Sequence, residues 1–193
     1  MALIPDQKQL LFQQILDTSR QQKDLWIFAY ASLIWRPEFE VTESRLARVH
    51  GWHRALQMWS RVNRGTPEKP GLVFALIQGG SCLGMAIKAP AGQQQQILQQ
   101  LWEREMPTGV YQPKWIQCQT SQGAVQALAF TLPKSSPNYT GVLSDTAYRR
   151  IMADRVGGRF GHTLDYAQQT LQCLQELGIK DHVLAQLLKR STQ

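Results

Sequence analysis

The sequence contains few of the residues that build metal sites and disulfide frameworks. Its 193 residues include three cysteines, Cys82, Cys118 and Cys173, and four histidines. The cysteines are odd in number and widely spaced, with no Cys-x-x-Cys pair, so neither a zinc site nor a set of disulfides is indicated. His50 and His53 are close in the sequence, but no other type of ligand clusters near them. This pattern favours ordinary sheet histidines over metal ligands.

Signature motifs and targeting segments are also missing. The chain has no Walker loop, no dinucleotide fingerprint, no Gly-x-Ser-x-Gly elbow and no His-Glu-x-x-His motif, which excludes several large classes of enzyme. Residues 1–23 carry scattered charges and many glutamines, so we expect no signal peptide. No stretch is apolar enough to span a membrane. These absences predict a cytoplasmic protein that does not associate with membranes.

Composition and charge are those of an ordinary globular protein. Hydrophobic residues make up 43% of the chain and charged residues 18%, and the length suits a single domain over residues 1–193. The net charge of +7 is spread along the chain, with local concentrations at residues 45–64 and 149–159. A basic balance favours anionic ligands in general, but it does not select nucleic acid over a small carboxylate.

The predicted strands come mainly in the first two thirds of the chain. The apolar run at residues 25–30 predicts a strand buried on both faces. Residues 45–61 predict a pair of strands or one long bent strand, with Gly51 as the bulge or bend. Two hairpins are expected, and they join residues 72–78 to 82–88 through Gly79-Gly80-Ser81 and residues 115–119 to 124–131 through Ser121-Gln122-Gly123.

The predicted helices flank these strands. Residues 6–21 predict a helix within an N-terminal extension over residues 1–23, and residues 93–106 predict a helix between the two hairpins. Residues 144–190 are expected to be helical, with Ser144 as an N-cap and a glycine-rich turn at residues 157–161. Strands first and helices late indicate an α+β fold with a largely antiparallel sheet.

Glu105 occupies a place where an apolar helix face would carry another hydrophobic residue. The side chains that share this face, at spacings i, i+3, i+4 and i+7, are Leu98, Leu101, Trp102 and Glu105. Glu103 and Arg104 are expected to point the other way. Pro107 ends the helix, which places Glu105 in its last turn, at the negative end of the macrodipole. Burial and the dipole both raise the pKa of a carboxyl group, as a general base near neutral pH requires. The alternative is a helix-end glutamate that caps the helix or extends to solvent.

The turn after the first predicted strand is the second candidate site. It reads Tyr30-Ala31-Ser32-Leu33. A strand that ends in small residues leaves consecutive backbone N–H groups available, and such groups can bind an anion or a developing oxyanion. A simple turn without a ligand is the alternative.

Four blocks of sequence occur in the order seen in the ChaC family, and they lie at residues 26–37, 51–54, 64–71 and 101–111. Between about Asp24 and about Gln169 the chain therefore resembles this family of glutathione-specific γ-glutamylcyclotransferases. The resemblance implies the cyclotransferase-like fold, a small mixed or antiparallel β-barrel flanked by helices, with no metal or organic cofactor. It also implies that Glu105, in the Arg-Glu-Met block, is the catalytic base.

Two segments depart from the family pattern. The usual Tyr-Gly-Ser-Leu has Ala31 in place of its glycine, and if that glycine normally has a positive φ, the alanine is strained or the loop is rebuilt. The late Gly-x-Asn-x-Glu/Gln-Tyr-Leu pattern appears at residues 161–167 with Tyr166 retained, the asparagine replaced and the carboxylate shortened.

The resemblance implies that glutathione is cyclised to 5-oxoproline with release of cysteinylglycine. We expect the substrate to be bound by the backbone of one loop and by five side chains. The candidates are the backbone N–H groups of Ala31, Ser32 and Leu33, the hydroxyl groups of Tyr30 and Tyr111, the retained Tyr166, and Arg54 and Arg61. Either arginine would pair with the glycyl carboxylate, although both are equally suited to the solvated surface.

Two other functions stay open. The chain could cyclise a different γ-glutamyl amide, or it could be a binding module, either a degenerate relative that holds γ-glutamyl ligands or a basic nucleic-acid binder. The presence of Glu105 favours an enzyme. We therefore expect a monomer whose partner is the small-molecule substrate glutathione, with no nucleic acid and no membrane.

Overall fold

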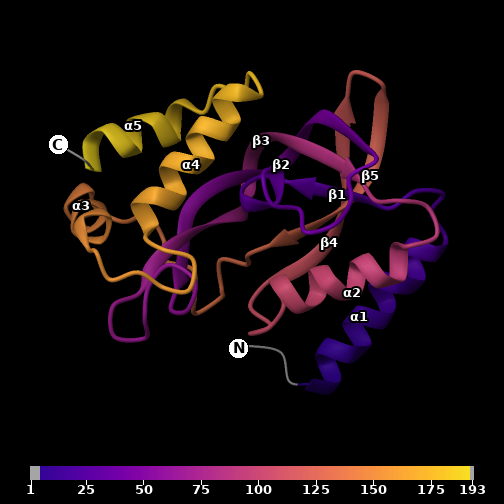
Figure 1. The fold of residues 1–193 in the computed structure, drawn as a ribbon, viewed down its shortest axis with the longest axis horizontal. Helices are drawn as coiled ribbons and strands as arrows, with labels where there is room; N and C mark the ends of the chain where they lie inside the picture. Colours follow the sequence, from indigo (N-terminus) through magenta and orange to yellow (C-terminus); the bar gives the residue numbers. More distant parts are fainter. Residues whose placement is uncertain (1–4, 192–193) are drawn as a thin grey trace. The chain divides into compact units, whose positions relative to one another are not determined.

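The computed structural model describes residues 5–191, and these form two compact units (Figure 1). The first unit holds the residues up to His53 and residues 76–136, and the second holds residues 54–75 and those from 137 onward. Two long strands, β2 (Glu43–Ser60) and β3 (Gly71–Lys88), contribute residues to both units. The prediction of a single domain is not decided by this division.

The strands form a closed barrel, as the resemblance to the ChaC family implies. The other three strands are β1 (Trp26–Ala29), β4 (Gln112–Thr120) and β5 (Gly123–Thr131). Their order is β1-β3-β2-β4-β5, and β5 closes the barrel by pairing in parallel with both β1 and β3. All four residues of β1 are buried, as its continuous apolar run predicts. The α+β prediction is confirmed.

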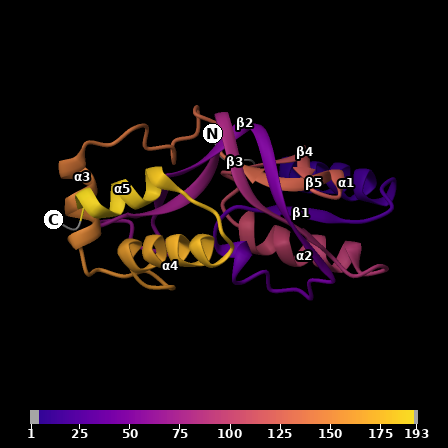
Figure 2. The ribbon, with the colours of Figure 1, turned by 90° about the horizontal axis from the view of Figure 1, so that it is seen from above.

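The hairpin predicted at Gly79-Gly80-Ser81 is wrong, because residues 71–88 form the single strand β3 (Figures 1 and 2). Gly79 and Gly80 have φ values of 114° and 68°, a conformation that suits a bulge as well as a turn. The ring Nδ1 of His53 in β2 lies 2.8 Å from the carbonyl oxygen of Gly79, which ties this irregular stretch to the neighbouring strand. In β2, Gly51 has a φ of 79°, so the prediction of one long bent strand is confirmed.

The second predicted hairpin is present. Strands β4 and β5 pair antiparallel along their whole length, from Gln112 opposite Thr131 to Thr120 opposite Gly123. Gly123 has a φ of 101°, which an L side chain rarely adopts, and this explains why a glycine stands at the turn.

Two helices belong to the first unit, α1 (Pro5–Arg20) and α2 (Gln94–Glu105), and both lie within a residue or two of the predicted ranges. They lie side by side (Figure 1), with the rings of Phe12 and Trp102 in an edge-to-face contact at 5.2 Å. The Lys8 ammonium donates a hydrogen bond to the carbonyl of Pro107, just beyond the end of α2. Helix α1 therefore packs along α2 and stabilises its position.

The second unit contains the C-terminal helices α3 (Asp145–Ala153), α4 (Thr163–Glu176) and α5 (His182–Ser191). The hydroxyl of Ser144 accepts a hydrogen bond from the N–H of Ala147, so the predicted N-cap is confirmed. The hydroxyl of Thr163 accepts the N–H of Leu72 at 2.8 Å and so joins the start of α4 to the start of β3. No helix within residues 5–191 is long and apolar enough to cross a membrane.

Candidate active site

Glu105 is the last residue of α2 and lies at the edge of the core. The helix ends there because Pro107 has no N–H with which to extend it. The last hydrogen bond of the helix runs from the N–H of Met106, whose side chain is buried, to the carbonyl of Trp102. The Glu105 side chain is 17% exposed. Burial raises the pKa of the Glu105 carboxyl group, the adjacent Arg104 guanidinium lowers it, and the negative charge of Glu38 raises it further. The net direction is upward, as the sequence predicts for a general base.

Arg104 does not point away from Glu105, so that prediction is wrong. Its side chain is 18% exposed, and its Nε lies 2.9 Å from Oε1 of Glu105. Its Nη2 donates to the hydroxyl of Ser32 at 3.0 Å, and its Nη1 lies 3.3 Å from a carboxylate oxygen of Glu38 and donates to the carbonyl of Arg36. A helical projection places neighbouring residues about 100° apart. An arginine in the final turn is nevertheless long enough to curl back to its neighbour.

The loop after β1 forms a short 3₁₀ turn, η1 (Ser32–Ile34), in the same unit as Glu105. Its first hydrogen bond runs from the N–H of Ile34 to the carbonyl of Ala31. The N–H groups of Ser32 and Leu33 precede that bond and so have no acceptor within the turn. Because Arg104 binds the Ser32 hydroxyl, this loop and the Glu105 carboxylate are held by one side chain.

Ala31 has a φ of −147°, outside the left-handed region that favours glycine. A positive φ was the condition under which the added methyl group would strain the loop, and the structure does not meet that condition. The alanine is buried, and its ψ of −124° differs from that of an ordinary extended residue.

The two predicted tyrosines of the first unit meet at Phe130 in β5. The Tyr30 hydroxyl donates a hydrogen bond to the carbonyl of Phe130 at 3.0 Å, and the ring of Tyr111 lies edge-on to the ring of Phe130 at 6.5 Å. Both tyrosines are buried. Their role as orienting hydroxyl groups stays a prediction.

The other three predicted binding residues lie in the second unit. Arg54 donates from Nε and Nη2 to one carboxylate oxygen of Asp181, and its side chain is only 4% exposed. Arg61 donates to the side-chain carbonyl of Asn138. Tyr166 is buried, and the guanidinium carbon of Arg64 lies over its ring, 4.5 Å from the ring centroid. The role of Arg54 as a carboxylate anchor stays a prediction, and the buried pair with Asp181 would have to open for it.

A model of the ChaC-like protein family matches residues 25–193. The chain belongs to this family. The ChaC-like chain is 38% identical over 167 residues to the glutathione-specific gamma-glutamylcyclotransferase of Escherichia coli (strain K12), a match that covers 85% of this chain and 71% of that protein. It is 32% identical over 160 residues to glutathione-specific gamma-glutamylcyclotransferase 1 of Homo sapiens, which covers 80% of this chain and 71% of the human protein.

Solved structures support the fold of this ChaC-like chain. A crystal structure of a yeast gamma-glutamyl cyclotransferase specific to glutathione aligns with a TM-score of 0.78 and 19% identity, over 89% of this chain and 96% of that one. A further gamma-glutamyl cyclotransferase structure aligns with a TM-score of 0.54 and 14% identity, over 86% of each chain. The implied cyclotransferase-like barrel is thereby confirmed.

Glu38 lies beside Arg104 in the ChaC-like chain, although no pattern in the sequence indicates this position. Glu38 lies in an irregular segment between η1 and β2, so no periodic pattern indicates its direction. The signal for Arg104 was stronger, because it directly precedes Glu105 in the Arg-Glu-Met block.

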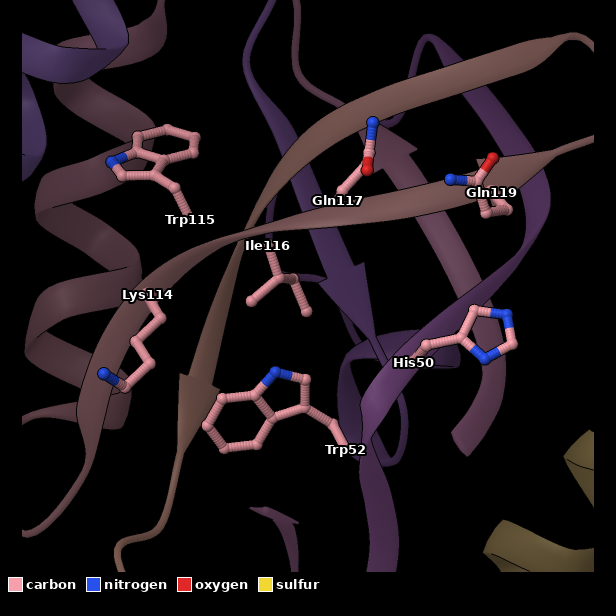
Figure 3. A pocket seen from close by; sticks show the side chains of 7 residues that line it. All are labelled: His50, Trp52, Lys114, Trp115, Ile116, Gln117 and Gln119. Atoms are coloured by element: carbon pink, nitrogen blue, oxygen red, sulfur yellow. The ribbon is translucent and has the colours of Figure 1, made fainter. Parts of the chain in front are cut away.

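A cavity of about 380 Å³ lies elsewhere in the first unit, between β2 and β4 (Figure 3). Figure 3 shows that its walls include His50 and Trp52 from β2 and Lys114 and Trp115 from β4. None of the predicted site residues lines it. Within residues 5–191, no group of three or more histidine, cysteine, aspartate or glutamate side chains is arranged to hold a metal ion.

Proposed function

We propose that this protein is a glutathione-specific γ-glutamylcyclotransferase, a lyase that converts glutathione to 5-oxoproline and cysteinylglycine. Membership of the ChaC-like family and the names of its relatives in Escherichia coli and Homo sapiens support this activity. The structural observation that carries the proposal is Glu105, a largely buried carboxyl group with a raised pKa, held beside the η1 loop.

The reaction begins with removal of a proton from the α-ammonium of the γ-glutamyl group by Glu105. An ordinary α-amino group has a pKa of about 8, so a carboxylate with a raised pKa accepts this proton at a smaller free-energy cost than an ordinary glutamate. The freed amine then attacks the γ-carbonyl carbon of the same group. Because nucleophile and carbonyl belong to one molecule, the protein has only to fold the chain and move protons.

The attack forms a new C–N bond and places a negative charge on the former carbonyl oxygen. Backbone N–H groups of the loop are our candidate donors to this oxyanion, and those of Ser32 and Leu33 precede the first hydrogen bond of η1. Collapse of the intermediate breaks the original amide C–N bond. Glu105 passes its proton to the leaving nitrogen, then takes the second proton from the new ring nitrogen and passes it to the same amine. Cysteinylglycine thus departs with an ammonium group, the ring nitrogen keeps one proton, and Glu105 is ionised for the next cycle.

The remaining binding roles complete the proposal. We assign Tyr30 and Tyr111 to orientation of the glutamyl group. The binding roles expected from the sequence for Tyr166, Arg54 and Arg61, which lie in the second unit, stay predictions. The net charge of +7 is distributed along the chain, which supports a protein that works without nucleic acid. We further infer that it acts as a cytoplasmic monomer.

The decisive experiment incubates purified protein with glutathione and measures 5-oxoproline and cysteinylglycine by mass spectrometry. Glu105→Gln keeps the shape of the side chain and removes its basicity, so we expect turnover to fall by at least about 10²-fold. Glu103→Gln is the matched control, because Glu103 lies on the same helix, is exposed and hydrogen-bonds only Gln99 among the contacts described.

Near wild-type turnover in Glu105→Gln would refute the assignment of the base. Wild-type protein that forms 5-oxoproline from another γ-glutamyl amide but not from glutathione would keep the reaction and change its leaving group. Wild-type protein that binds glutathione and forms no product would support a binding module instead.

A further inference from the structure

The guanidinium of Arg104 is the point at which the parts of the candidate site meet. It contacts the carboxylates of Glu105 and Glu38, the hydroxyl of Ser32 and the carbonyl of Arg36. Its acceptors thus come from the end of α2, from η1 and from the segment that follows η1. The planar guanidinium has five N–H donors in a fixed geometry, so it can hold several acceptors in one arrangement, which a lysine ammonium cannot do.

Glu38 has an unusual backbone in this cluster. Within residues 5–191 it is the one non-glycine residue with a positive φ, at 63°. A side chain in this conformation has a free-energy cost, and residues that bear such a cost tend to lie at functional sites. One of its carboxylate oxygens lies 2.6 Å from Nη2 of Arg36 and the other lies 3.3 Å from Arg104. The strained backbone is therefore the conformation that presents Glu38 to both arginines.

We propose that Arg104 is a positioning residue that fixes the position of the Glu105 carboxylate relative to the η1 loop. Glu38 balances the positive charge of Arg104. This inference rests on the proposed γ-glutamylcyclotransferase activity and deepens it. Arg104 binds Oε1 of Glu105, so we assign proton transfer to the other carboxylate oxygen, Oε2. Fixing one oxygen restricts rotation of the carboxyl group and directs the second toward the substrate amine.

The arrangement has an electrostatic consequence that can be measured. The charged groups described around Glu105 are Arg104, which lowers its pKa, and Glu38, which raises it. Removal of the Arg104 charge should raise the pKa of Glu105, and removal of the Glu38 charge should lower it. Because the reaction requires ionised Glu105, the acid limb of the pH–rate profile follows this pKa.

The test compares Arg104→Gln, Arg104→Lys and Glu38→Gln in the full-length protein with glutathione as substrate. In Arg104→Gln we expect kcat to fall by about 10- to 100-fold with a smaller change in KM, since misplacement of a catalytic group by about 1 Å has effects of this size. Its acid limb should move to higher pH. Arg104→Lys retains the charge but not the fixed set of donors, so the limb should stay near that of the wild type while kcat falls.

Glu38→Gln should move the acid limb in the opposite direction, to lower pH. Arg190→Gln is the matched control, because Arg190 forms an exposed ion pair with Asp145 in the second unit, and it should leave kcat and the profile unchanged. Opposite shifts in the Arg104→Gln and Glu38→Gln variants are not expected from general loss of structure. Thermal unfolding of each variant shows whether the fold is retained.

A second measurement does not depend on turnover. Titration of the Glu105 side-chain carboxyl by ¹³C NMR should give a higher pKa in Arg104→Gln and a lower one in Glu38→Gln than in the wild type. If the wild-type protein forms no 5-oxoproline while these shifts occur, the proposed function fails and the electrostatic coupling stands. If the wild type is active but folded Arg104→Gln and Glu38→Gln match it in kcat, acid limb and Glu105 pKa, the positioning proposal is refuted.

Discussion

Replacement of Glu105 by glutamine should make the fold more stable at neutral pH while it removes activity. Burial raises the pKa of the Glu105 carboxyl, and this outweighs the lowering by Arg104. The folded state therefore binds a proton at Glu105 more tightly than the unfolded state, where a glutamate has a pKa of about 4.3. Glutamine has the shape of the carboxyl group and can still accept the Nε–H of Arg104, but it carries no charge that burial must desolvate.

The sign of the pH dependence follows from this linkage. Below about pH 4 Glu105 is protonated in both states, so the wild type and the Gln variant should have similar stabilities. As the pH rises through the raised pKa of the folded state, the wild type loses stability relative to the variant. Above that pKa the difference should reach a plateau.

The size of the plateau is set by the difference between the folded and unfolded pKa values. Each unit of difference corresponds to about 1.4 kcal/mol in the free energy of unfolding. For a chain of this length each 1 kcal/mol moves Tm by about 2–4 °C, so each unit corresponds to roughly 3–6 °C. Such a shift is well within the range of a thermal unfolding experiment.

The assay is thermal unfolding followed by circular dichroism between pH 4 and pH 8 for the wild type, Glu105→Gln and the control Glu103→Gln. Glu103 is exposed, so its substitution should change Tm little at any pH. The reasoning is wrong if Glu105→Gln has a lower Tm than the wild type at pH 7–8, or if its Tm difference does not grow with pH.

Two further substitutions test the packing of β1 and the loop that follows it. Gly84→Ala should cost about 1–3 kcal/mol of stability, because an added Cβ would lie 2.5 Å from the carbonyl oxygen of Ala29, at the end of β1; an unchanged urea midpoint would contradict this close contact. Ala31→Gly should change kcat/KM for glutathione by less than about threefold, since the φ of −147° at Ala31 lies outside the left-handed region that favours glycine. A large fall in activity of the folded glycine variant would mean that the alanine is adapted to a different substrate or loop shape.

The parts of the fold that could be predicted are those with local signals. The apolar run of β1 and the turn between β4 and β5 carry their own evidence, and both are confirmed. The pair Gly79-Gly80 has the composition of a hairpin turn, but it lies within one strand. A positive φ suits a bulge and a turn alike, and the choice depends on which strands pair across the barrel, which no local pattern reveals.

The residues of the candidate site likewise differ in whether a local sequence pattern indicates them. Helical periodicity placed Glu105 at the end of an apolar face, and its raised pKa follows from that burial. The periodicity argument was wrong for Arg104. It predicts the direction of a side chain from its Cβ atom, whereas a long side chain at a helix end can bend back to a neighbouring residue. Glu38 could not be found from the sequence at all, since an irregular segment with one positive φ brings it to the cluster.

If Glu105 is the general base, as proposed, the cluster of Glu105, Arg104 and Glu38 explains how a largely buried carboxyl group can accept a proton at neutral pH. Burial alone raises the pKa of the carboxyl, and too large a rise would leave it protonated and unable to accept a proton at neutral pH. An arginine alone would favour the ionised form and weaken the base. In this protein burial and Glu38 act in one direction and Arg104 in the other. The two residues beside Glu105 are therefore expected to determine the pH range in which it works, and variation at either position in related chains should move that range without changing the reaction.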